Sequence, residues 1–290
     1  MIYGKVKPIS IMLTDKSENI ASLDLQAKIF DIGYIVVSRS NHSILDKLWQ
    51  FYQSEEEPYV TDGFYSTMMH TDFEHKKAVN TFLCSQLYEF ASLFLNNYKP
   101  LFANYLVKSP KTNRQVGLHQ DWTYTDELKY HSINVWMPLQ ATNAQNGALY
   151  VVPGSHKLPY SLRYTPFDEK LYDVDIKLLK RKAVLIETKP GDAVIYDSRL
   201  LHFSEGNLSN DYRVACAGIF LPEAAPAMHY FRKGNEIHEY STNMDFYCKL
   251  MPGVQPQQNP IRIFQNSEIP SNDSVNDFLK NAQDVVEEKA

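Results

Sequence analysis

Hydrophobic residues in the first hundred positions recur at helical spacing in two segments. Between Leu45 and Tyr52 an apolar side chain returns every three or four residues, after a polar cluster at 38–43 that is suited to starting a helix. The segment 73–97 repeats this spacing over more turns. Its apolar positions are Val79, Phe82, Leu83, Leu87, Phe90 and Phe94. The pattern predicts two amphipathic helices, and the short apolar run 31–38 ahead of them predicts a strand.

Beyond Pro100 the pattern changes to short apolar runs with the length and the residue types of β-strands. These runs are 102–107, 133–139, 148–152, 183–188, 192–196 and 213–221. Pairs that form turns separate several of them, such as Asn146-Gly147 and Pro190-Gly191. Many short strands after a helical segment predict a mainly β fold with flanking helices. We expect a double-sheet jelly roll buttressed on one face by the N-terminal helices.

The length and composition favour a single domain over residues 1–290. Of the 290 residues, 44% are hydrophobic, which is enough apolar material for one sizeable core. Residues 1–100 are predicted to be the mainly helical N-terminal support, and residues 101–222 the jelly-roll core with the metal site. Residues 223–290 are predicted to be a loop-rich C-terminal extension and tail.

Two segments of the C-terminal extension differ in composition. Residues 222–270 are rich in Pro, Asn, Gln and Tyr, which predicts long loops with one short helix. Residues 271–290 are polar, which predicts a terminal helix or a frayed tail.

Charge and targeting patterns argue against several classes of protein. The formal net charge is -5 and no long run of one sign occurs, so we expect no nucleic-acid partner. No stretch approaches the roughly 18 apolar residues of a membrane-spanning helix, and the first ten residues lack the pattern of a signal peptide. We therefore expect a cytoplasmic protein without a membrane partner. The cysteines Cys84, Cys216 and Cys248 are widely separated, which predicts reduced, structural thiols.

Two His-x-Asp tripeptides are candidates for a metal site. Residues two apart on an extended strand point to the same side, so the His and the Asp can converge on one ion. An iron that must also bind a 2-oxo acid and oxygen needs two imidazoles and one carboxylate on one face. His70 and Asp72 lie between the two predicted helices, where Asp72 is suited to capping the second helix. His119 and Asp121 open the β-rich half, and they are the predicted metal pair.

His202 is the best candidate for the third ligand, because it follows a strand that returns to the same mouth of a β-sandwich. Arg213 stands eleven residues later, which leaves room for a turn and the start of a neighbouring strand. Its guanidinium could there bind a carboxylate bidentately, and the hydroxyl of Ser204 could bind the same carboxylate. A surface salt bridge would explain Arg213 alone, but the combination with the metal residues favours a pocket.

Together these motifs resemble the phytanoyl-CoA dioxygenase family of iron(II)- and 2-oxoglutarate-dependent oxygenases. The resemblance covers roughly residues 27–222 and is densest in the β-rich half. It rests on HQDW at 119–122, the strand with Trp136, NGALYVVPGSHK at 146–157, KPGD at 189–192, His-x-Ser at 202–204 and the arginine at 213. The resemblance implies a double-stranded β-helix, which is the cupin-like form of the jelly roll.

The resemblance also implies the cofactors. Fe(II) would be held by His119, Asp121 and His202, with 2-oxoglutarate and O2 as cosubstrates. The 2-oxo-carboxylate end of 2-oxoglutarate would chelate the iron, and its far carboxylate would lie on Arg213 and Ser204. Further pocket candidates are Trp136, which is one residue out of register, Gln120, Asn134 and Lys108. Because the carboxylate ligand is present, the related halogenase site is disfavoured.

Four residues are candidates for contact with the substrate. Tyr124 stands three residues past Asp121, in a loop that could lie over the metal. The other three are in the C-terminal extension, where they could line a lid; they are His229, Tyr230 and Tyr240. Packing or surface roles remain open for each of them. His156, in the motif PGSHK, needs no ligand role, because the preceding turn explains the motif.

The predicted function is hydroxylation of an unactivated C–H bond in a small polar metabolite or a biosynthetic intermediate, with release of succinate and CO2. Desaturation, epimerisation or cyclisation would use the same residues. Two alternatives from other classes remain. One is a different metal enzyme on a cupin-type barrel, such as a zinc hydrolase, which would not need the Arg213 clamp. The other is a non-catalytic binding protein with a degenerate site.

Overall fold

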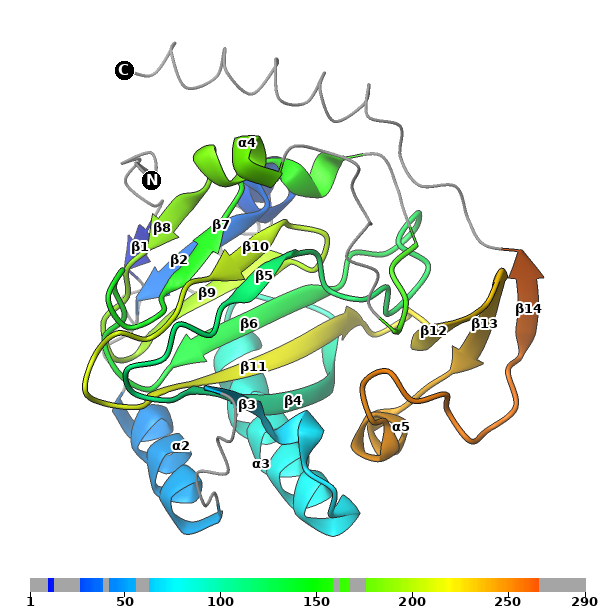
Figure 1. Ribbon diagram of the computed structural model, residues 1–290, viewed down its shortest axis with the longest axis horizontal. Coiled ribbons are helices and arrows are strands. Elements are labelled where there is room, and N and C mark those ends of the chain that lie inside the picture. The colour runs from blue at the N-terminus through cyan, green and yellow to red at the C-terminus, as the bar shows by residue number, and fades with distance from the viewer. Residues whose placement is uncertain are drawn as a thin grey trace.

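Two facing β-sheets dominate the computed structural model, which describes residues 10–12, 27–38, 42–55, 63–158, 162–166 and 176–265 (Figure 1). The larger sheet has the order β1-β2-β9-β6-β11-β4-β3. Its strands are β1 (Ser10–Met12), β2 (Tyr34–Ser38), β3 (Phe64–Ser66), β4 (Tyr98–Lys108), β6 (Ile133–Pro138), β9 (Asp192–Asp197) and β11 (Arg213–Pro222). The smaller sheet has the order β5-β10-β7-β8. Its strands are β5 (Val116–His119), β7 (Leu149–Val151), β8 (Val184–Ile186) and β10 (His202–Ser204), and the short helix α4 (Ile176–Arg181) precedes β8.

The chain alternates between the two sheets in the way of a jelly roll. Of the strands from β4 to β11, the larger sheet contains β4, β6, β9 and β11, and the smaller sheet contains β5, β7, β8 and β10. Among these eight, strands that are neighbours in either sheet pair antiparallel. The predicted mainly β fold with flanking helices is confirmed. The predicted strand runs correspond to β2, β4, β6, β7, β8, β9 and β11. They did not include the short strands β1, β3, β5 and β10.

The larger sheet is buried on both faces, which explains why its strands read as continuous apolar runs. In β6 the side chains of Val135 and Met137 belong to the core under the helices, whereas Trp136 belongs to the core between the sheets. Strand geometry places Asn134 on the same face as Trp136. Side chains on this inner face are therefore available to a site inside the jelly roll.

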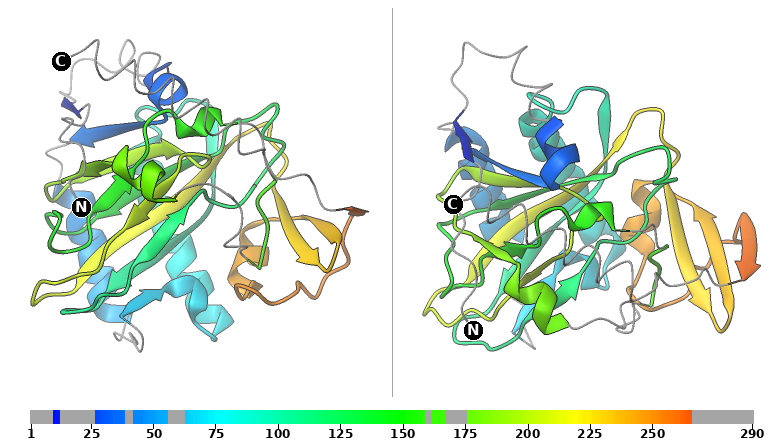
Figure 2. Two further views of the ribbon diagram at one scale, coloured as in Figure 1. Left: turned by 45° about the horizontal axis from the view of Figure 1, so that its top comes forward. Right: turned by 90° about the horizontal axis from the view of Figure 1, so that it is seen from above.

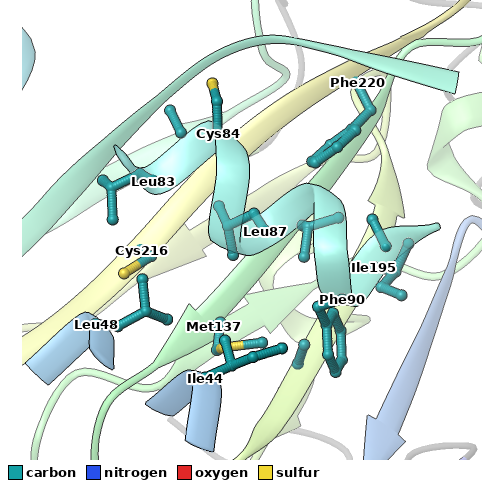
Figure 3. Packing of buried hydrophobic residues seen from close by; sticks show 14 of the residues in the cluster. Ile44, Leu48, Leu83, Cys84, Leu87, Phe90, Met137, Ile195, Cys216 and Phe220 are labelled. Carbon is teal, nitrogen blue, oxygen red and sulfur yellow. The ribbon is translucent and has the colours of Figure 1, made fainter. Parts of the chain in front are cut away.

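Two helices cover the outer face of the larger sheet (Figure 1). They are α2 (His42–Glu55) and α3 (Phe73–Ala91), which confirms both predicted helices. Figure 3 shows Leu83, Leu87 and Phe90 of α3 directed at the strands. The packing is close, because a Cβ added to Gly218 of β11 would lie 2.8 Å from Cδ1 of Leu87.

The ends of α3 follow local chemistry. Asp72 is its N-cap, with Oδ1 accepting the backbone N–H groups of Glu74 at 2.8 Å and His75 at 3.1 Å. The helix ends at Ala91, six residues before the predicted boundary at position 97. Turns occupy the intervening residues, and Asn97 adopts a positive φ of 59° before β4 begins.

The prediction of long loops over 222–270 was wrong for the residues up to 265. These form a third sheet beside the jelly roll, of order β12-β13-β14, with one short helix (Figure 2). The elements are β12 (Met228–Lys233), β13 (Glu236–Ser241), α5 (Met244–Lys249) and β14 (Arg262–Gln265). Gly234 and Asn235, a pair suited to a tight hairpin, join the first two strands, and Gly234 has φ 63°. The high content of polar residues hid this hairpin signal. The predicted segment 271–290 lies outside the described residues.

The turn at Gly147 packs closely against Lys108 and the backbone that follows β10. Gly147, in the predicted Asn146-Gly147 turn, has φ 76°. A Cβ there would lie 2.9 Å from Cδ of Lys108 and 3.0 Å from the carbonyl oxygen of Glu205. The turn before β7 therefore packs tightly on the end of β10, so glycine is required both for the backbone angle and for the space.

Two other expectations concern cysteines and membranes. Cys84, Cys216 and Cys248 are free and buried, as predicted. Within the described residues of the chain, no helix is long and apolar enough to cross a membrane.

We predict that Leu87→Ala lowers the free energy of unfolding by about 2–5 kcal/mol, because Leu87 is fully buried between α3 and the sheet. Urea unfolding would measure the loss. The matched control is Leu128→Ala, at a leucine that is 75% exposed, and its effect should stay within about 0.5 kcal/mol. A loss below about 1 kcal/mol for Leu87→Ala would contradict the described packing.

Candidate metal centre

The pairing of β5 with β10 brings His119 opposite His202. These residues are direct partners in the antiparallel register, and their ring centroids lie 4.2 Å apart. Asp121, two residues beyond His119, completes the group. One ligand atom from each of the three residues lies within 4.8 Å of the other two. The structure therefore brings together the three residues that the sequence suggested as metal ligands.

The orientation of both imidazoles suits metal binding through Nε2. Nδ1 of His119 lies 2.8 Å from the carbonyl oxygen of Gly117, and Nδ1 of His202 lies 2.9 Å from that of Leu200. A carbonyl oxygen only accepts hydrogen bonds, so each Nδ1 must carry the proton. The lone pair of each ring is then on Nε2, the tautomer that a histidine ligand needs.

Burial keeps His202 in the form that binds metals. Desolvation and the neighbouring His119 lower the pKa of His202 to about 4, and Asp121 opposes this effect. The imidazole is therefore neutral near pH 7. Two imidazoles with one carboxylate are the donor set that suits a divalent iron with open coordination positions.

Asp121 is fixed on both sides. Nδ2 of Asn134 donates to its Oδ2 at 3.1 Å, and its Oδ1 lies 3.9 Å from Nε2 of His202. Nε of Arg163 donates to the backbone carbonyl oxygen of Asp121 at 2.5 Å. Arg163 in turn forms a buried two-point ion pair with Glu127, at 2.8 and 2.6 Å. Neither partner of this pair was predicted, because nothing local in the sequence links position 163 to position 121.

Arg213 is a buried cation without a carboxylate partner among the described residues. Arg213 is the first residue of β11, and it is 2% exposed. Nη1 donates to the carbonyl oxygen of Leu106 at 3.2 Å, and no described group accepts a hydrogen bond from Nε. Burial lowers its pKa to about 10, so it stays charged at neutral pH. Such a guanidinium is suited to an anionic ligand.

A row of side chains on the inner face of β6 connects the metal candidates with Arg213. Asn134 contacts Asp121, and Trp136 lies under the guanidinium of Arg213, with 5.8 Å from Cζ to the ring centroid. The Cα atoms of Asn134 and Trp136 are roughly 7 Å apart, from the rise of about 3.3 Å per strand residue. The metal candidates and Arg213 therefore both have a neighbour on the inner face of β6.

Two other predicted pocket residues are engaged by backbone carbonyls. Nζ of Lys108 donates to the carbonyl oxygens of Ser204, at 3.1 Å, and Glu205. Burial and the charge of Arg213 lower the pKa of Lys108 to about 6, with Glu205 acting in the opposite direction. Nε2 of Gln120 donates to the carbonyl oxygen of Arg199. In this structure Lys108 and Gln120 hold backbone segments of the site together, and their contact with a cosubstrate stays a prediction.

Three of the four candidate substrate residues lie in or against one buried aromatic cluster. Tyr124 and Tyr240 belong to one buried apolar cluster, which also includes Phe102, Phe246 and Tyr247 and against which Trp122 packs. His229 contacts that cluster through its ring neighbours Trp122, at 5.4 Å, and Tyr247, at 6.0 Å. Tyr230 is directed elsewhere, to a separate cluster with Leu162, Tyr164 and Ile237. The alternation of side chains along β12 explains the separation of His229 from Tyr230.

His229 is buried and has one nitrogen without a described partner. Nε2 lies 2.9 Å from Oγ1 of Thr165, and no described group hydrogen-bonds Nδ1. Burial lowers the pKa of His229 to about 3, so the ring is neutral. Within the described structure, the ring therefore has hydrogen-bonding capacity to spare beside the aromatic cluster.

The other histidines of interest have structural contacts. Nδ1 of His70 accepts the backbone N–H of Asp72 at 3.0 Å, and Asp72 caps α3. Nε2 of His156 lies 3.0 Å from the carbonyl oxygen of Phe30, and the side chain is buried. Among the described residues, the one group of three or more His, Cys, Asp and Glu side chains that could hold a metal ion is His119, Asp121 and His202.

Comparison of the sequence with known proteins identifies relatives for most of the jelly roll. The family profile described as phytanoyl-CoA dioxygenase matches residues 38–215. A phytanoyl-CoA dioxygenase domain-containing protein 1 homolog from Dictyostelium discoideum is 33% identical over 121 residues, which cover 38% of this chain and 42% of that protein. The chain thus aligns with less than half of the length of the curated relatives it matches first.

Solved structures with the same fold are more distant in sequence. The epimerase SnoN, in complex with Fe3+, alpha ketoglutarate and nogalamycin RO, superimposes with a TM-score of 0.56 at 15% identity, over 84% of this chain and 96% of that chain. EvdO2 from Micromonospora carbonacea var. aurantiaca, in complex with 2-oxoglutarate, gives a TM-score of 0.52 at 20% identity, over 70% and 91% of the two chains. At these identities the similarity establishes the shared fold.

We predict that His202→Ala weakens Co(II) binding at least about 100-fold, because the site loses one of three protein ligands. Isothermal titration calorimetry with Co(II), under anaerobic conditions, would measure the affinity. His70→Ala removes the histidine of the other His-x-Asp tripeptide and is the matched control, with unchanged affinity expected. Equal losses in the two variants would contradict the assignment of the site.

We also predict that His229 destabilises the fold in acid. Its folded pKa of about 3 lies below the ordinary value of about 6.5, so the unfolded chain binds the proton first as the pH falls. The free energy of unfolding should therefore drop between pH 6.5 and pH 3 by up to about 1.4 kcal/mol per pH unit from this group. In His229→Phe the slope, measured by urea unfolding at several pH values, should be shallower. Parallel curves for the two proteins would argue against a neutral buried His229.

Proposed function

This chain belongs to the phytanoyl-CoA dioxygenase family, and from that premise we propose that it is an iron(II)- and 2-oxoglutarate-dependent dioxygenase. Its proposed reaction is hydroxylation of an unactivated C–H bond in a small polar metabolite or a biosynthetic intermediate, with release of succinate and CO2. The observation that carries the proposal is the combination of the His119, Asp121 and His202 donor set with the buried guanidinium of Arg213, which has no carboxylate partner among the described residues.

The proposed division of labour follows from the geometry. Iron with 2-oxoglutarate and O2 supplies, when bound, the oxidising power for C–H cleavage. His119, Asp121 and His202 hold the metal, and Asn134 orients the carboxylate of Asp121 through its 3.1 Å hydrogen bond. Arg213 binds the far carboxylate of 2-oxoglutarate, with Ser204 as an additional hydrogen-bond donor.

Trp136 serves two purposes in this proposal. Its indole contacts the guanidinium of Arg213, and its position in the core between the sheets keeps water away from that charge. In a dry site the attraction between Arg213 and a carboxylate is stronger than it would be at the surface. The same exclusion of water would protect the oxidising centre from side reactions.

The substrate is proposed to approach from the side of Trp122, Tyr124 and His229. These residues are close to Asp121 along the chain or through ring contacts, and they join the jelly roll to the C-terminal sheet. Nδ1 of His229 has no described partner and is available for a polar group of the substrate. Tyr240, in the same buried cluster, would shape this wall without reaching the metal. Tyr230 remains a weaker candidate, because it packs in a different cluster.

A different metal enzyme on a cupin-type barrel is the second candidate. Zinc hydrolases also use two histidines and one carboxylate, so the donor set alone does not separate the two functions. A hydrolase has no need for a buried arginine beyond the metal, so the observation of Arg213 favours the oxygenase.

Residues 1–290 are proposed to act as one domain, in the cytoplasm and without nucleic-acid or membrane partners.

The decisive experiment is an anaerobic titration of the metal-free protein with Fe(II) and 2-oxoglutarate. Chelation of Fe(II) by a 2-oxo acid produces a weak visible charge-transfer band, and we expect this band at one equivalent of each component. A zinc-type hydrolase or a degenerate site would give no band, and that outcome would refute the proposed function. Release of succinate from 2-oxoglutarate in air, lost in His119→Ala, would link the band to turnover.

Replacement of the arginine tests the carboxylate clamp. We predict that Arg213→Gln raises the 2-oxoglutarate concentration needed for the band by roughly 100-fold, since two charge-assisted hydrogen bonds are worth about 3 kcal/mol or more. Binding of Fe(II) alone should change little. The matched control is Arg262→Gln, at an arginine that pairs with Glu239 in the C-terminal sheet. An unchanged 2-oxoglutarate requirement in Arg213→Gln would remove the proposed role.

A further inference from the structure

The turn between β9 and β10 contacts both segments that carry the candidate metal ligands. Three consecutive carbonyl oxygens of this turn accept hydrogen bonds from those segments. The carbonyl of Ser198 accepts the backbone N–H of Asp121 at 2.9 Å. The carbonyl of Arg199 accepts the side-chain amide of Gln120, and that of Leu200 faces Nδ1 of His202 at 2.9 Å. The position of this turn therefore affects Asp121 and His202 together.

The carboxylate of Asp197 holds the turn in shape. Its Oδ1 accepts the backbone N–H of Arg199 at 2.9 Å, which closes a local side-chain turn. The guanidinium of Arg199 adds two more contacts, from Nε to Oδ1 at 3.0 Å and from Nη2 to Oδ2 at 2.9 Å. Nδ1 of His131 lies 2.8 Å from Oδ2. Both oxygens of one fully buried carboxylate are thus used inside this turn and its immediate surroundings.

The surrounding backbone leaves the turn little freedom. The N–H of Leu200 donates to the carbonyl oxygen of Asp197 at 2.8 Å, and the N–H of Ser198 donates to that of Ser132 at 3.0 Å. The side chain of Leu200 packs against Gly33, where an added Cβ would lie 2.5 Å from its Cδ1. Asp197 itself binds through its N–H to the carbonyl oxygen of Gly33 at 3.0 Å. These contacts anchor the two ends of the turn, and the carboxylate of Asp197 bonds the N–H and the side chain of Arg199 between them.

We infer that Asp197 is a positioning residue for the metal centre: its carboxylate fixes the carbonyls of residues 198–200, which in turn aim His202 and Asp121 at one ion. Asp197 is not one of the three candidate metal ligands. It acts on His202 through the carbonyl of Leu200, which sets both the tautomer and the direction of the ring. The inference rests on the proposed function, because it requires a metal at these residues.

A purely structural role for Asp197 makes a different prediction. Loss of a buried carboxylate with three hydrogen-bonded donors would lower stability wherever it occurred in the fold. A positioning role predicts in addition that the metal affinity and the geometry of the coordination sphere change in the folded protein. Stability and metal binding must therefore be measured separately.

The test uses Co(II) as the probe, because it resists oxidation in air and its visible absorption reports the coordination geometry. Two variants of the whole chain are compared with the parent protein. Asp197→Asn keeps an oxygen that can accept the N–H of Arg199, but it lacks the charge that balances the guanidinium. Asp197→Ala removes both. We expect Co(II) affinity to fall by about 10–100-fold in Asp197→Ala and by less in Asp197→Asn, with altered visible bands in both.

The matched control is Glu239→Gln. Glu239 is also a buried carboxylate that pairs with an arginine, at 2.6 Å from Nη2 of Arg262, but this ion pair lies in the C-terminal sheet, away from the segments that carry the ligands. This variant should unfold at lower urea concentration while its Co(II) affinity stays within twofold and its spectrum stays the same. It thus shows the effect of neutralising a buried, arginine-paired carboxylate without a positioning role.

The outcomes separate the two proposals. If the parent protein binds no Co(II), the proposed function fails. If the parent binds Co(II) and folded Asp197→Asn binds it with the same affinity and spectrum, the positioning role of Asp197 is overturned. Circular dichroism identifies the folded variants, and Asp197→Asn carries the test if Asp197→Ala does not fold. A weaker affinity with altered bands in Asp197→Asn, and neither change in Glu239→Gln, supports the inference.

Discussion

The pairing of β5 with β10 is the contact on which the candidate site depends. It sets His119 directly opposite His202, from positions more than eighty residues apart in the sequence. Because side chains alternate along a strand, a shift of the register by one residue would turn one of these imidazoles away from the other. The smaller sheet is held in place by β7 and β8, and the core between the sheets joins it to the larger sheet. The apolar packing of the jelly roll therefore has a chemical consequence, since it fixes the register that assembles the ligands.

The interior of the jelly roll also contains an imbalance of charge. Arg213 and Lys108 face each other across β4 and β11, and both side chains are almost completely buried. Backbone carbonyls accept hydrogen bonds from Nζ of Lys108, and its lowered pKa of about 6 reduces the electrostatic repulsion between the neighbours. Arg213 stays charged, with its indole neighbour Trp136 in place of a carboxylate. A buried cation in this state raises the energy of the ligand-free protein, and the carboxylate of the proposed cosubstrate would lower that cost on binding.

Sequence patterns captured what is local or periodic, and what a short motif encodes. The stripe on 73–97 predicted α3, and the spacing from His202 singled out Arg213, whose side chain is buried in the structure. Contacts between distant positions were out of reach. Nothing near Arg163 indicates that it binds the backbone of Asp121, because the contact exists only once the segment 162–166 lies beside β12. The third sheet was missed for a different reason, since β12 and β13 carry many polar residues, so their hydrophobic alternation is weak.

The buried cluster around Tyr124, proposed above as the wall of the substrate site, is built by two regions of the chain. Strands of the jelly roll contribute Phe102 and Ile219, whereas Tyr240, Phe246 and Tyr247 come from the C-terminal sheet and α5. The ligand residues and their supporting turn lie outside the latter region. Changes in the C-terminal elements can therefore reshape the wall while the register of β5 and β10 stays intact. The two regions are therefore separable: the shape and polarity of this wall can change while the candidate metal ligands and their supporting turn keep their positions.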